Sequence, residues 1–88
     1  MRTEKGAYIL KMIYKKLQRL IAEQCGLDDP DEVDCELDFE DDLGFSDFNM
    51  VELSVAVESE FDIELTDEQI ASIKNVGDLL DAIEENLI

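Results

Sequence analysis

The stretch that most constrains how this chain folds runs from Asp41 to Glu60, where an acidic loop leads into a helix. At about 100° per residue, that helix has two apolar sides. The side spaced like a core stripe contains Met50, Leu53, Ser54, Val57 and Phe61. The roughly opposite side contains Phe48, Val51 and Val55, interleaved with Glu52 and Ser59. Because one apolar side is enough to join a core, the second side predicts a docking surface, although scattered surface hydrophobes are also ordinary.

The length of the chain limits what it can do. Eighty-eight residues predict one domain over residues 1–88, with room for a modest core but not for a deep catalytic cleft as well. A hydrophobic content of 45% argues against disorder, despite a net charge of −17.

The charge is divided unevenly along the chain. Residues 1–26 hold six of the seven basic residues and two acids, a net +4, whereas residues 27–88 hold 22 acids and one lysine, a net −21. Such a field repels nucleic acid and anionic membranes and attracts basic protein surfaces. Acidity that serves only solubility is the alternative interpretation.

Composition also excludes several kinds of chemistry. The chain has no histidine, which excludes histidine-assisted nucleophilic catalysis and histidine metal sites. Cys25 and Cys35 fit no common zinc spacing and no disulfide framework, and we predict no metal site. The apolar run from Ala7 to Tyr14 is broken by Lys11 and has no cleavage site after it. It is therefore neither a signal peptide nor a membrane span, and we expect a cytosolic protein.

Apolar spacing and cap residues predict an all-α bundle of three long helices and one short helix, with no strand. We expect these helices at about residues 7–25, 47–60, 67–73 and 76–87, after frayed residues 1–6. Gly26 ends the first helix, and Ser46, Thr66 and Asn75 cap the next three. The last helix has the clearest apolar stripe: Val76, Leu79, Leu80, Ile83 and Leu87.

The first connection, residues 27–45, is long for so small a domain. Loops of this length are usually functional or are held to the core by their own apolar residues. Asp29-Pro30 predicts a turn near its start, and a short helical turn follows around residues 31–33. We expect five side chains to anchor the loop: Leu27, Val33, Leu37, Phe39 and Leu43.

One set of motifs resembles a known family. Leu43-Gly44 precedes Val51-Glu52-Leu53, and Glu58-x-Glu60-Phe61-Asp62-Ile63-Glu64 follows. This pattern closely resembles the acyl carrier proteins, and the likeness covers all but about ten N-terminal residues, which look like an extension of the first helix. The resemblance implies a four-helix bundle with a long first loop, in agreement with the pattern of apolar residues and caps.

The resemblance further implies a carrier, not an enzyme. A 4′-phosphopantetheine arm on a serine would present acyl groups as thioesters to fatty-acid or polyketide-type biosynthetic enzymes. Such acyl-transferring enzymes, and a phosphopantetheinyl transferase, would bind the second helix with basic surfaces of their own. Their contacts would be Phe48, Val51, Glu52 and Val55. We expect a monomer without nucleic-acid or membrane partners.

The sequence departs from the family at the attachment triplet. Where the family has Asp-Ser-Leu, this chain has Ser46-Asp47-Phe48, so Asp47 holds the position of the attachment serine. Ser46, one residue early, is the candidate attachment residue, but a one-residue shift turns a side chain by about 100° around a helix. Ser46 is equally suited to cap the helix, and Asp47 suits the positive helix end. An arm-less interaction module with the same fold is therefore the alternative function.

Two other functions fit the sequence less well. Asp38, Glu40 and Asp42 alternate as in a calcium-binding loop, but Leu43 and Asn49 occupy the positions of its required glycine and glutamate. Paired-carboxylate catalysis needs a buried pair, and nothing in the sequence marks one. The prediction is an acyl-carrier-like domain that serves as an acidic docking partner.

Overall fold

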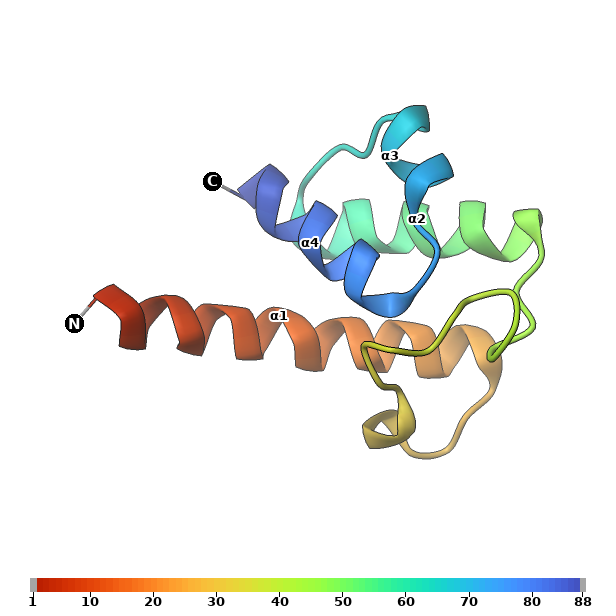
Figure 1. The fold of residues 1–88 in the computed structure, drawn as a ribbon, viewed down its shortest axis with the longest axis horizontal. Coiled ribbons are helices and arrows are strands. Elements are labelled where there is room, and N and C mark those ends of the chain that lie inside the picture. The colour runs from red at the N-terminus through yellow and green to blue at the C-terminus, as the bar shows by residue number, and fades with distance from the viewer. Residues whose placement is uncertain (1, 88) are drawn as a thin grey trace.

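The computed structural model describes the backbone of residues 2–87 and the side chains of residues 11–87. Residues 2–87 form four α-helices and one short 3-10 helix, η1 (Figure 1). In chain order these are α1 (Arg2–Cys25), η1 (Pro30–Glu32), α2 (Asp47–Phe61), α3 (Asp67–Ser72) and α4 (Val76–Leu87). The predicted all-α bundle with a long first loop is confirmed.

Helix α1 is the longest element, and its N-terminal turns extend past the rest of the bundle (Figure 1). The expectation that residues 1–6 fray is wrong for residues 2–6, which belong to α1, while Met1 lies outside the described residues. The helix ends as predicted, because Gly26 adopts φ +75° and Leu27 N–H donates to the Ala22 carbonyl (2.8 Å).

One apolar core joins α1, α2, α4 and the first loop. Its most deeply buried side chains are Leu17, Ile21, Val33, Phe39, Leu53, Val57, Val76, Leu79 and Ile83. These positions recur at three- and four-residue intervals within each helix, so each helix turns one stripe toward the same interior. Burial of this apolar surface is the main force that holds the bundle together.

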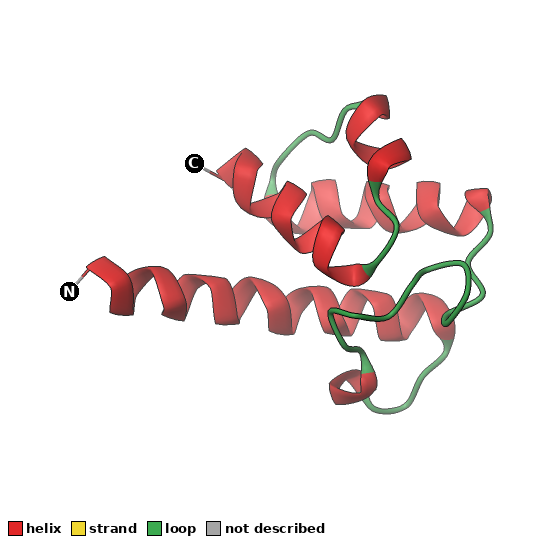
Figure 2. Cartoon of the chain, in the orientation of Figure 1, coloured by secondary structure: helices red, strands yellow, loops and turns green. Residues whose placement is uncertain are grey.

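The first loop, residues 27–45, crosses the bundle, passes beside the start of α4 and then leads into α2 (Figure 2). Its predicted anchors are confirmed, with Val33 and Phe39 buried and Leu27, Leu37 and Leu43 partly buried against the core. The predicted helical turn appears as η1. An isolated antiparallel bridge pairs Asp38 with Asn75, but residues 2–87 contain no strand.

Two side chains of α1 hold the loop at a single point. Gln18 Nε2 and Tyr14 Oη both donate to the Val33 carbonyl, at 2.8 and 3.0 Å. Gln18 is buried, so the bond also satisfies a polar group that would otherwise be costly inside the core. Burial, followed by interaction with Cys35, raises the pKa of Tyr14.

The last two helices begin at the predicted caps. Thr66 Oγ1 accepts from Gln69 N–H (3.1 Å), and Asn75 Oδ1 accepts from Asp78 N–H (2.8 Å). The predicted burial of Met50 and Phe61 is wrong, because both side chains are only partly buried. Leu87, at the end of the apolar stripe of α4, is 43% exposed.

Candidate functional site

The approach to α2 is a tight turn anchored by two phenylalanines. Phe39 and Phe45 are buried with ring centroids 5.2 Å apart, and Phe45 N–H donates to the Phe39 carbonyl (2.7 Å). Between them Gly44 adopts φ +67°, a conformation that residues with a Cβ rarely adopt. This turn fixes where the helix starts, and it delivers the chain to solvent at Ser46.

Ser46 was predicted either to carry the arm or to cap the helix, and the structure shows it as the cap. Its Oγ accepts from the backbone N–H of Asn49 (3.3 Å) and donates to Asn49 Oδ1 (2.9 Å). In return Asn49 Oδ1 accepts from the backbone N–H of Ser46 (2.9 Å), which completes a capping box. The hydroxyl is exposed, yet it is turned toward the first turn of its own helix.

Asp47 is the first residue of α2 and is exposed. Its carboxylate lies at the positive end of the helix, where a negative charge is stabilising. The position that the resemblance assigns to the attachment serine therefore holds an acid suited to a helix start.

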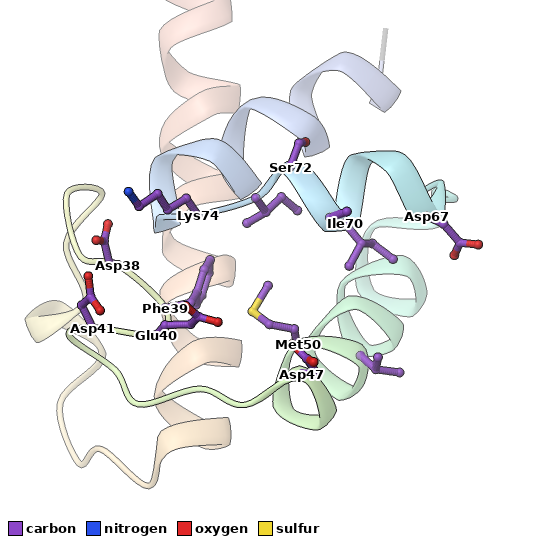
Figure 3. A pocket seen from close by; sticks show the side chains of 13 residues that line it. Asp38, Phe39, Glu40, Asp41, Asp47, Met50, Asp67, Ile70, Ser72 and Lys74 are labelled. Atoms are coloured by element: carbon purple, nitrogen blue, oxygen red, sulfur yellow. The ribbon is translucent and has the colours of Figure 1, made fainter.

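A groove of about 630 Å³ opens beside Asp47, between the first loop, α2 and α3 (Figure 3). Its apolar lining comes from Phe39, Met50, Val51, Ile70, Ala71 and Ile73. Its charged lining comes from Asp38, Glu40, Asp41, Asp47, Asp67 and Lys74. The partial exposure of Met50, wrongly predicted as buried, is explained by this groove.

The second apolar side of α2 is turned to solvent. Phe48, Val51 and Val55 are 69%, 55% and 59% exposed, whereas Leu53 and Val57 on the same helix are at most 1% exposed. The exposed Glu52 accepts a hydrogen bond from Gln24 Nε2 of α1 (3.0 Å). The predicted exposure of this side is confirmed, and its role in docking stays a prediction.

Three residues that position this region were not predicted from the sequence. Phe45 was not among the predicted anchors, although an aromatic residue directly after Leu43-Gly44 is a signal that could have found it. Tyr14 and Gln18 hold the loop from α1 across 19 and 15 residues of sequence, and no local pattern marks such bonds.

The part of the chain that the structure describes shows neither a metal-binding cluster nor a membrane-spanning helix. No group of three His, Cys, Asp or Glu side chains within it is arranged to hold a metal ion. Cys25 and Cys35 are free thiols, and burial raises the pKa of Cys25. No described helix is both long and apolar enough to cross a bilayer.

Comparisons with known proteins agree with the helical fold described above. A family model described as a phosphopantetheine attachment site matches residues 15–83. An acyl carrier protein of Clostridium acetobutylicum is 42% identical over 72 residues, covering 82% of this chain and 92% of that protein. This chain belongs to the acyl carrier protein family.

Two further members of the acyl carrier protein family match over most of their length. The acyl carrier protein of Bdellovibrio bacteriovorus is 42% identical over 73 residues, covering 83% of this chain and 92% of the relative. The crystal structure of an acyl carrier protein from Thermotoga maritima superposes with a TM-score of 0.73 at 31% identity, covering 89% of each chain.

Family membership also bears on the predicted cofactor. The matched domain of acyl carrier proteins carries a phosphopantetheine prosthetic group, so the cofactor predicted from the resemblance is confirmed as the group of this family. The residues of this chain do not fit that group at the start of α2. Asp47 offers a carboxylate, which cannot form the phosphodiester of a serine, and the only hydroxyl beside it is held in the capping box.

Proposed function

We propose that this chain is a docking module of acyl metabolism, bound through the exposed side of α2 by enzymes that handle acyl groups. The main support is the exposure of Phe48, Val51 and Val55, each more than half accessible on a helix whose other side holds the buried Leu53 and Val57. Adjacent exposed apolar side chains mark interaction surfaces more often than isolated ones do. The surface lies at the start of α2, beside the groove.

Charge favours partners with basic docking surfaces. Residues 27–88 carry a net −21, and Glu52 lies among the three apolar side chains. Fields of this strength accelerate encounter with basic proteins and repel nucleic acid and anionic membranes. The hydrogen bond from Gln24 holds the Glu52 carboxylate in place, which lowers the entropy lost when a partner lysine or arginine pairs with it.

Presentation of acyl groups as phosphopantetheine thioesters is the finer role that family membership favours, with Ser46 as its candidate residue. Docking on α2 does not depend on whether Ser46 carries an arm, so the geometry supports docking more directly. In both roles the chain is bound by enzymes, and those enzymes supply the chemistry. A fatty-acid or polyketide-type pathway, the cytosolic location and the monomeric state stay predictions.

A binding experiment tests the docking proposal. The probe is a purified bacterial acyltransferase of fatty-acid synthesis, titrated with the full chain in calorimetry at low ionic strength. Val51→Asp should weaken binding at least tenfold, because it places a charge where apolar contact is expected, and should leave the melting temperature nearly unchanged. Leu87→Asp is the matched control, since Leu87 is exposed on α4. Equal loss in both variants, or no loss in Val51→Asp, would refute a docking surface on α2.

A further inference from the structure

We infer that the start of α2 accepts no phosphopantetheine arm, and that the domain acts as an arm-less competitor of loaded carriers for their enzymes. The competitor role rests on the docking function proposed above. The first part rests on where the hydroxyl groups lie, and the second on what the docking surface does without an arm.

The hydroxyl groups of residues 11–87 are almost all engaged. Tyr14, Ser54 and Ser72 donate to the backbone carbonyls of Val33, Met50 and Gln69. Thr66 and Ser46 are in capping boxes. Ser59 is exposed but lies about three turns beyond Asp47, on the part of α2 farther from the groove. The start of α2 therefore offers one hydroxyl, that of Ser46.

The starts of α2 and α3 show that this hydroxyl has a purely structural explanation. In α2, Ser46 is followed by Asp47 and paired with Asn49, and in α3, Thr66 is followed by Asp67 and paired with Gln69. The bonds match closely. The cap residue's backbone N–H donates to the paired side chain, at 2.9 Å in α2 and 3.0 Å in α3. The paired residue's backbone N–H donates to the cap hydroxyl, at 3.3 Å in α2 and 3.1 Å in α3.

A hydroxyl followed by an aspartate thus begins two helices of this chain, α2 and α3, and only α2 carries the proposed docking surface. Ser46 Oγ both accepts from and donates to Asn49, and an arm on that oxygen would remove its donor proton and crowd the cap. A hydroxyl at position 47 would lie outside the cap, but this position holds an aspartate, which has no hydroxyl.

The docking surface, in contrast, is intact. Phe48 directly follows Asp47, Val51 lies four residues after it, and both side chains are exposed. A domain that presents this surface without an arm occupies an enzyme and delivers no acyl group. Its effect on such an enzyme is inhibition by competition.

One assay separates the two parts of the inference. The full chain is incubated with coenzyme A, magnesium and a broad-specificity phosphopantetheinyl transferase, and intact mass is followed over time. Asp47→Ser keeps the Ser46 cap and adds a hydroxyl at the first position of the helix, so it should gain one arm. The wild type should gain none in the time that converts Asp47→Ser completely. Circular dichroism verifies that both proteins are folded.

The same reaction measures docking. Unmodified wild-type protein, added in excess to Asp47→Ser, should slow its modification at least tenfold, and the Val51→Asp variant should not. An arm on the wild type would overturn the arm-less inference and leave docking untouched. A wild type that stays unmodified and slows nothing would overturn the proposed docking and the competitor role with it. An Asp47→Ser variant that gains no arm would overturn the inference that Asp47 closes the site.

Discussion

The two sides of α2 belong to one fifteen-residue helix but have opposite surroundings. One side, with Leu53 and Val57, is packed against the core, and the other, with Phe48, Val51 and Val55, is more than half exposed. Both are apolar, so hydropathy alone does not explain the difference. The bundle buries one stripe of α2, and the second stripe remains exposed to solvent.

The largest effect should come from the packed side. Leu53→Ala should lower the free energy of unfolding by about 2–5 kcal/mol, because the side chain is 1% exposed and its removal leaves a cavity. Val55→Ala, on the exposed side, is the matched truncation and should change stability by no more than about 0.5 kcal/mol. Urea unfolding measures both, and similar losses in the two variants would mean that the sides are wrongly assigned.

A smaller effect should come from the cap at which both sides begin. Ser46→Ala should cost about 0.5–2 kcal/mol, because the first turn loses a side-chain acceptor and Asn49 loses a donor. Thr66→Ala should cost a similar amount at α3, where the bonds are nearly the same. Thermal unfolding compares the two. A Ser46→Ala variant as stable as the wild type would show that Ser46 is not held for its cap.

The smallest effect should come from added salt. Salt should stabilise the fold but weaken the binding of a partner. Monovalent salt screens the repulsion within the −21 region and should raise the melting temperature by a few degrees, whereas it should weaken binding of a basic partner. Magnesium or calcium at millimolar concentration should raise the melting temperature further, by binding preferentially to the denser charge of the folded state. Equal shifts at equal ionic strength would exclude that preferential binding.

Much of this fold could be predicted because its signals are local. The caps Ser46, Thr66 and Asn75 and the terminator Gly26 act within four residues of themselves, so sequence order alone reveals them. Apolar periodicity likewise locates the two apolar sides of α2. Both kinds of signal depend on chemistry that the neighbouring residues already contain.

The remaining features depend on contacts between distant segments. The bonds from Tyr14 and Gln18 to Val33 join α1 to the loop end of η1, and no spacing rule relates them. The partial exposure of Met50 depends on the groove between the first loop, α2 and α3, which are distant in sequence. For the candidate site, the sequence left two roles open for Ser46, and the geometry of the capping box was needed to weigh them.

The most direct test of docking on the exposed side of α2 is a map of amide chemical shifts. The ¹⁵N-labelled full chain is titrated with the bacterial acyltransferase, at a salt concentration that preserves binding. The account predicts that the largest changes fall between Ser46 and Val55, with smaller ones along the groove at Ile70 and Lys74. Changes concentrated on the solvent side of α1, around Lys11 and Lys15, with α2 undisturbed, would contradict it.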